Sequence, residues 1–132
     1  MKGLTIKINP MERFIINGAV VENGKRRTVL CIKTPKTNLL RMKDAIHPED
    51  ASTPVKRACH IAQLALSNDL CPEVAHDEIA NSIDMLKSAF DELDVKNDLG
   101  VALSAVSDHN FYLTLKHLKA MIELERHLLK DF

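Results

Sequence analysis

Three consecutive basic residues, Lys25, Arg26 and Arg27, follow the turn-forming pair Asn23-Gly24 and are the residues best suited to chemistry in this sequence. Arginine and lysine side chains bind phosphate through charge-assisted hydrogen bonds, so this run predicts a phosphate-binding edge. A charged strand edge that only prevents aggregation is the alternative, and composition alone favours it by about two to one. Neighbouring strands and turns could add Arg13, Lys33, Lys36, Arg41 and Lys43 to this edge.

The charges are distributed unevenly along the chain, although its net charge is zero. Residues 1–57 contain 12 Lys or Arg and 5 Asp or Glu, a net charge of +7, whereas residues 58–132 contain 6 and 13, a net charge of −7. A basic front half suits an anionic partner such as RNA, and an acidic back half suits a basic protein or a second copy. Both classes of partner therefore stay open.

Signatures of catalysis and metal binding are absent from the sequence. It contains no Gly-rich phosphate loop, no nucleophile elbow and no H-E-x-x-H helix. Cys59 is adjacent to His60, and Cys71 and His76 lie five residues apart, so neither pair has the spacing of a zinc site. We expect a protein that is not an enzyme and that holds no metal or other cofactor.

The composition predicts a folded cytoplasmic protein. Of its 132 residues, 45% are hydrophobic and 27% are charged, which is typical of a globular domain. No apolar run approaches the roughly 20 residues of a membrane span, and the first ten residues lack the apolar segment of a secretory signal. Three irregularly spaced cysteines predict reduced thiols. We therefore expect no membrane partner.

The elements that would position the basic run are short strands. Residues 4–9 alternate apolar and polar side chains, and two apolar runs flank Asn17-Gly18, a strong hairpin signal. Asn23-Gly24 repeats that signal before further strands over residues 28–33 and 38–41. If residues 25–27 are part of a strand, Lys25 and Arg27 project to one face and Arg26 to the other. Phe14 is the only aromatic residue of the basic half, so we expect RNA contacts without stacked bases.

Helical periodicity begins after Thr53-Pro54, an N-cap followed by proline at the first helical position. Apolar residues at helical spacing then predict about four helices, the last capped by Asp108 or Asn110. The predicted fold class is α+β: a small N-terminal antiparallel β-meander or barrel packed against a C-terminal helical bundle. We expect a basic β-rich lobe over residues 1–46 and a helical lobe over 47–132, together forming one compact unit. The apolar positions of the predicted helices are Val55, Cys59, Ala62, Leu66, Ile79, Ile83, Leu86, Phe90, Leu93, Phe111, Leu115, Leu118, Ile122 and Leu129.

Several motifs occur together in the first seventy residues: Ile-Ile-Asn-Gly-Ala-Val, Glu-Asn-Gly-Lys-Arg-Arg, Glu-Asp-Ala-Ser-Thr-Pro and the pair Gln63-Leu64. In combination and order they resemble the FlbT family of flagellin-synthesis regulators, which the helical tail resembles more loosely. The resemblance implies a cytoplasmic, non-enzymatic regulator that associates with the leader of flagellin mRNA and controls its translation and stability. It also implies a second small regulator, FlaF, as a partner. The resemblance is compatible with either repression or activation of flagellin production.

A weaker similarity links the β half to small CsrA-type RNA-binding regulators. Glu12, residues 16–18, Pro35 and Arg41 occur in a comparable order. This similarity implies RNA-facing residues near Lys7 and Arg41.

The leading hypothesis is a post-transcriptional regulator that binds RNA through its basic half. We expect phosphate or base contacts from Lys25, Arg26, Arg27 and Arg41, supported by Arg13, Lys33 and Lys43. The alternative is a protein-binding adaptor that acts through FlaF, flagellin or the export machinery without touching RNA. It would use the acidic half and an uncovered apolar helix stripe, such as the one beginning at Ile79. A homo-oligomer is compatible with both hypotheses.

Overall fold

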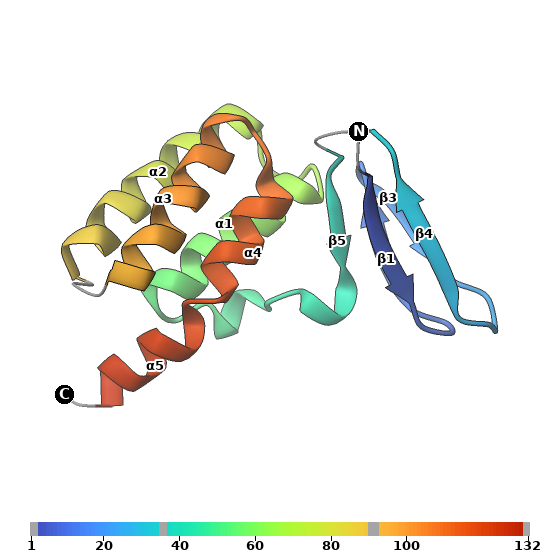
Figure 1. The fold of residues 1–132 in the computed structure, drawn as a ribbon, viewed down its shortest axis with the longest axis horizontal. Coiled ribbons are helices and arrows are strands. Elements are labelled where there is room, and N and C mark those ends of the chain that lie inside the picture. The colour runs from blue at the N-terminus through green and yellow to red at the C-terminus, as the bar shows by residue number, and fades with distance from the viewer. Residues whose placement is uncertain (1–2, 35–36, 90–92, 131–132) are drawn as a thin grey trace.

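The computed structural model describes residues 3–34, 37–89 and 93–130, which form a β part and a helical part side by side (Figure 1). This arrangement confirms the predicted α+β class, with antiparallel strands first and helices after them. The strands are β1 (Leu4–Ile8), β2 (Arg13–Ile16), β3 (Ala19–Glu22), β4 (Thr28–Ile32) and β5 (Leu39–Arg41). The 3-10 helices are η1 (Met42–Asp44) and η2 (Pro48–Asp50), and the α-helices are α1 (Pro54–Leu66), α2 (Pro72–Ala89), α3 (Leu93–Ser107), α4 (Phe111–Lys119) and α5 (Ile122–Lys130).

The strands are divided between two sheets. One has the order β3-β2-β5 and the other pairs β1 with β4, all antiparallel. The hairpin at Asn17-Gly18 is confirmed, because β2 pairs with β3 and both turn residues have positive φ, 50° and 86°. The prediction of a second hairpin at Asn23-Gly24 is wrong. β4 pairs with β1 rather than with β3, and neither Asn23 nor Gly24 has the positive φ that a type I′ turn requires.

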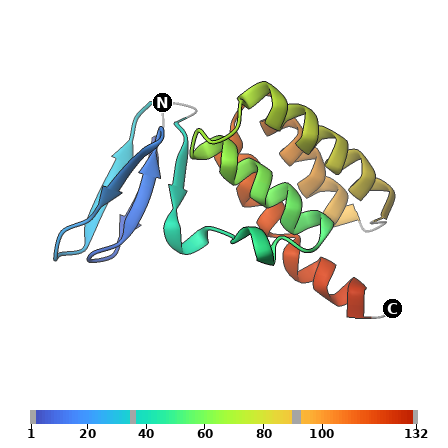
Figure 2. The ribbon, with the colours of Figure 1, turned by 180° about the vertical axis from the view of Figure 1, so that it is seen from behind.

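Strand β5 joins the two parts, because its neighbouring leucines are buried in different cores. Successive strand residues point to opposite faces. Leu39 packs with Ile6, Ile8 and Phe14 in the core of the β part, whereas Leu40 belongs to the helical core. Tyr112 of α4 packs against both cores. Figure 2 shows the chain running from β5 through η1 and η2 to α1.

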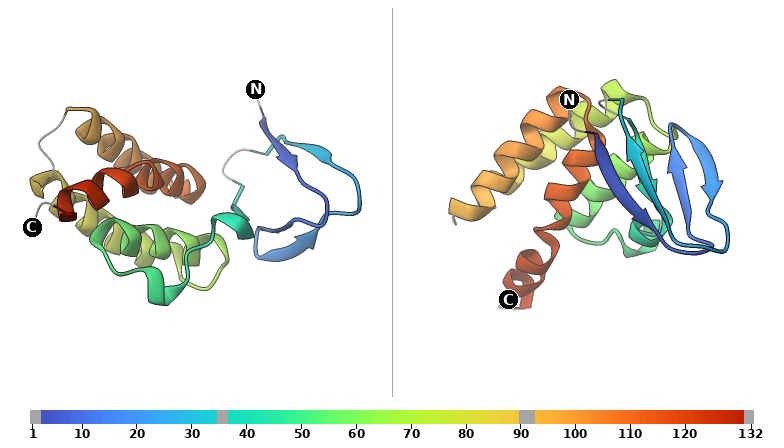
Figure 3. Two further views of the ribbon diagram at one scale, coloured as in Figure 1. Left: turned by 90° about the horizontal axis from the view of Figure 1, so that it is seen from below. Right: turned by 45° about the vertical axis from the view of Figure 1, so that its right-hand side comes forward.

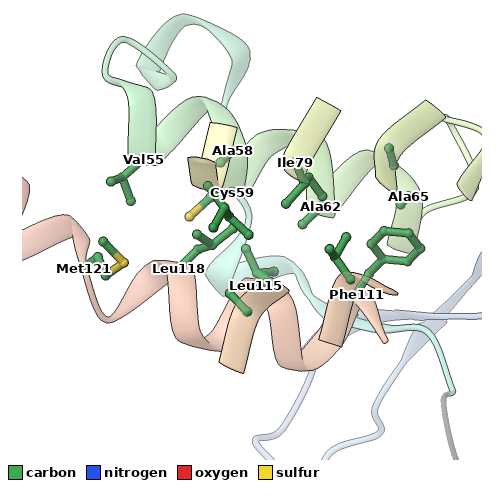
Figure 4. Close-up of a cluster of buried hydrophobic side chains, with 14 of the residues drawn as sticks. Val55, Ala58, Cys59, Ala62, Ala65, Ile79, Phe111, Leu115, Leu118 and Met121 are labelled. Carbon is green, nitrogen blue, oxygen red and sulfur yellow. The ribbon is translucent and has the colours of Figure 1, made fainter. Parts of the chain in front are cut away.

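The helical core forms between α1, α2, α3 and α4, and Figure 4 shows the part to which α1, α2 and α4 contribute. Thr53 caps α1 as expected, since its hydroxyl oxygen accepts a hydrogen bond from the Lys56 N–H at 3.3 Å. Asn110 caps α4 in the same way, accepting from the Leu113 N–H at 3.2 Å. The apolar stripe that begins at Ile79 is core over its described length, because Ile79, Ile83 and Leu86 are all buried. Phe90 and the side chain of Leu93 lie outside the described residues.

The last predicted helix is two helices. The chain turns at Ala120 and Met121, and α5 extends from one end of the bundle (Figure 3). Glu125 of α5 is only 5% exposed. Its carboxylate accepts hydrogen bonds from the Thr53 hydroxyl and, at 2.9 Å, from the Val55 N–H. The free N–H groups and the positive dipole end of a helix favour a carboxylate, so Glu125 fastens α5 to the start of α1.

We expect Glu125→Ala to lower the free energy of unfolding by about 1–3 kcal/mol, because it leaves the buried Val55 N–H without its acceptor. The control is Glu123→Ala in the same helix, where an exposed carboxylate pairs with Arg126 and contributes less than about 1 kcal/mol. Urea denaturation of both variants measures the difference. Equal losses would show that the contact with α1 adds nothing.

Candidate nucleic-acid interface

The basic run lies in the loop that carries the chain from one sheet to the other. Residues 23–27 connect β3 to β4 at the end of the β part that is farthest from the helices (Figure 1). Lys25, Arg26 and Arg27 are all exposed, and none of them belongs to a strand. The expected alternation of their side chains between two faces of a strand is therefore wrong, because β4 begins only at Thr28.

Asn23 fixes the conformation of this loop. Its Nδ2 donates to the carbonyl oxygens of Asn9, at 2.8 Å, and Arg26, at 2.9 Å. Its Oδ1 accepts from the Gly24 N–H at 2.9 Å and from the Thr28 hydroxyl at 3.1 Å. The backbone of the loop is thereby held against the β1–β2 turn, which reduces the backbone entropy that a ligand would have to remove.

The backbone adds two further bonds between this loop and the β1–β2 turn. The Met11 N–H donates to the Gly24 carbonyl, and the Asn23 N–H donates to the Glu12 carbonyl, both at 2.9 Å. Met11 adopts a positive φ of 61° in this turn. The loop and the turn therefore form one hydrogen-bonded unit.

Arg41 lies beneath that unit in a two-pronged ion pair with Glu12. Its Nε and Nη2 each donate to a different carboxylate oxygen of Glu12 at 2.7 Å, and Nη2 also donates to the Lys7 carbonyl at 2.7 Å. The Asn9 N–H donates to the same carboxylate at 3.0 Å. The Arg41 hydrogen bonds are the main reason that the pKa of Glu12 falls from 4.5 to about 2. Arg41 thus ties β5 to β1 and to the turn that supports the basic loop.

The other predicted contact residues divide between the two ends of the β part. Arg13 pairs with Glu22, the residue directly before the loop, at 2.9 Å, and both side chains are largely exposed. The charge of Lys43 contributes to the lowered pKa of Glu12, so Lys43 lies at the same end. Lys33 follows the far end of β4, about 16 Å from the loop along the strand. The structure therefore gathers the predicted cations at one end, with Lys33 apart from them.

Lys7 joins this end of the molecule, although the sequence indicated it only through the weaker resemblance. It lies opposite Val29 on the outer face of the β1–β4 pair. Lys7 and Arg27 line the same shallow hollow of about 200 Å³. Its proximity to Arg27 follows from a pairing between strands that are distant in the sequence, which no local pattern reveals.

No group of three or more His, Cys, Asp or Glu side chains among the described residues could hold a metal ion. Burial raises the pKa of the Cys59 thiol to about 12, so this thiol stays protonated and unreactive at neutral pH. No described helix is long and apolar enough to cross a membrane. The feature that this end of the β part presents to solvent is a group of exposed cations on a hydrogen-bonded loop.

Comparison with known proteins gives a consistent result. Residues 4–129 match the family model described as "Flagellar protein FlbT". A protein of Caulobacter sp. (strain K31), named "Probable flagellum biosynthesis repressor protein FlbT", is 31% identical over 92% of each chain. The "Flagellum biosynthesis repressor protein FlbT" of Caulobacter vibrioides (strain ATCC 19089) is 28% identical over 92% of this chain and 86% of its own. A relative from Rhodopseudomonas palustris (strain TIE-1) is 29% identical over 96% of this chain and 97% of its own. No solved structure matches.

Proposed function

This chain belongs to the FlbT family of flagellar proteins, and on that premise we propose that it binds the leader of flagellin mRNA directly and controls its translation and stability. Its relatives bear the name of flagellum biosynthesis repressors, so the chain is a regulator of flagellar synthesis, and we propose that it is not an enzyme. We propose accordingly that it acts in the cytoplasm.

The preorganised basic loop is the observation that carries this proposal. No hydrogen bond or ion pair within the described residues engages the side chains of Lys25, Arg26 or Arg27, so their charges are available to a ligand. Lys7, Arg13 and Lys43 extend the cationic surface around them. Phosphate contacts supply most of the affinity of such surfaces for nucleic acid.

The remaining two predicted contact residues have narrower roles in this proposal. Arg41 is engaged with Glu12, so we assign it mainly to holding the loop in place. Lys33 touches RNA only if the strand follows β4 to its far end.

Replacing Lys25, Arg26 and Arg27 together with alanine should weaken binding to the leader at least tenfold. Because each phosphate contact to a single strand adds about 0.7 to the slope of log affinity against log salt, the slope should fall by about 2. The measurement is a titration of labelled leader RNA at low and moderate salt, against a scrambled RNA of equal length. The triple variant Lys56, Arg57 and Lys87→Ala removes the same charge from helices α1 and α2 and should bind normally.

Equal weakening by both triple variants would mean that only net charge matters, which would contradict a role for the loop. Absence of leader binding in the natural sequence would favour the second candidate, an adaptor that binds FlaF or flagellin. One observation suits that candidate. All four residues of β3 are exposed on a sheet edge, and Val20 is 70% exposed, so a partner could add a strand there.

A further inference from the structure

A groove between β5 and α4 is lined by both apolar and cationic side chains. Leucines of both elements line it, together with Tyr112, and Arg41, Lys116 and Lys119 surround it. Its volume is about 200 Å³, below the roughly 300–1,000 Å³ of pockets for drug-sized ligands. The groove is thus suited to one flat ring rather than to a whole cofactor. Figure 1 shows β5 on the side of the β part that faces the helices.

The lysines of this groove belong to a basic helix within the acidic half of the sequence. Residues 58–132 carry a net charge of −7, yet α4 contains no acidic residue and has Lys116, His117 and Lys119 in its last turn. The acidic half therefore presents a basic helix to the basic half. Lys116 is exposed beside β5, so an anionic group could bind at this boundary between the two halves.

Tyr112 supplies the aromatic ring that the sequence of the basic half lacks. Phe14, the only aromatic residue of that half, is 2% exposed and belongs to the core. The fold brings Tyr112, only partly buried, from the helical half to the boundary between the two cores. Aromatic rings beside cations are the usual means of holding single-stranded nucleic acid, with the base stacked on the ring and its phosphates on the cations.

We propose that the β5–α4 groove binds one unstacked base of single-stranded RNA against Tyr112, with the adjoining phosphates on Lys116 and Lys119. This inference rests on the proposed function, because it adds a base-binding position to the surface formed by the basic loop. Arg41 connects the two positions: it lines the groove, and through Glu12 it also holds the turn that supports the loop. A bound strand would thus run from the loop past β5 to α4.

The chain contains one tyrosine and no tryptophan, so a label on tyrosine reports on this groove alone. We expect full-length protein carrying 3-fluorotyrosine to give one fluorine NMR signal that shifts when leader RNA is added. Tyr112→Leu should weaken RNA binding about tenfold, and Tyr112→Phe, which keeps the ring, should restore it. Lys116→Ala should also weaken binding several-fold, whereas the matched Lys87→Ala on α2 should not.

Three other outcomes would each contradict the inference, and the measurements tell them apart. Salt-sensitive RNA binding with an unmoved fluorine signal and normal Tyr112→Leu affinity would leave the proposed function standing and remove the groove from it. A signal that moves with polyglutamate but not with RNA would make the groove a site for an acidic protein segment. If RNA binds neither the loop nor the groove, the inference and the proposed function both fail.

Discussion

Replacing Arg41 with alanine lowers the free energy of unfolding by about 3–5 kcal/mol, the largest stability effect that we expect in the β part. The reason is that Glu12 keeps its charge in a position where its side chain is only 8% exposed. Without Arg41 it loses two charge-assisted hydrogen bonds, and among the described residues the Asn9 N–H remains as its hydrogen-bond donor. Urea denaturation followed by circular dichroism measures the change.

A second arginine–glutamate pair in the same sheet is the control. Arg13 and Glu22 are 67% and 45% exposed, so Arg13→Ala should change stability by less than about 1 kcal/mol. Arg41→Lys should recover only part of the loss, because an ammonium group cannot form the two parallel bonds of a guanidinium. If Arg41→Ala and Arg13→Ala are equally mild, the ion pair with Glu12 does not support the fold.

Acidification removes the same stabilisation by protonating the carboxylate of Glu12. The carboxylate of Glu12 has a pKa of about 2 in the folded protein and an ordinary value of 4.5, so folding favours its charged form. Its contribution is fully present above the unfolded pKa and is lost as the pH falls from about 4.5 to 2. The shift corresponds to as much as about 3 kcal/mol at neutral pH.

We therefore expect Glu12→Gln to be less stable than the natural protein at pH 7 and to approach it in stability near pH 2. Urea denaturation across this pH range measures both curves. Glu22→Gln, in the exposed pair, is the matched control and should lose less than about 1 kcal/mol at pH 7. Parallel curves for Glu12→Gln and the natural sequence would show that Glu12 does not titrate with folding.

Local patterns in the sequence predicted the elements whose determinants are close together along the chain. Thr53-Pro54 marks the start of α1, and Asn17-Gly18 forms the hairpin, because in each case a residue and its neighbours determine the backbone. Asn23-Gly24 was misleading for the opposite reason. The side chain of Asn23 bonds to Asn9, fourteen residues away, and this contact holds a loop where the dipeptide alone predicts a turn.

The candidate site shows the same difference between features that local sequence predicts and features that depend on distant residues. The three cations of the loop are visible in the sequence, but the carboxylate that engages Arg41 lies 29 residues away, and Tyr112 reaches the β part only through the packing of α4. Residue type indicated that Arg41 could bind an anion. Only the tertiary fold shows that the anion is the side chain of Glu12.

The two leucines of β5 also couple the unfolding of the two parts. Leu39 is 1% exposed in the core of the β part and Leu40 is 3% exposed in the helical core, so one three-residue strand belongs to both cores. Separation of β5 from β2 would expose apolar side chains of both cores at once. We therefore expect the β part and the helical part to unfold in one cooperative transition rather than one after the other.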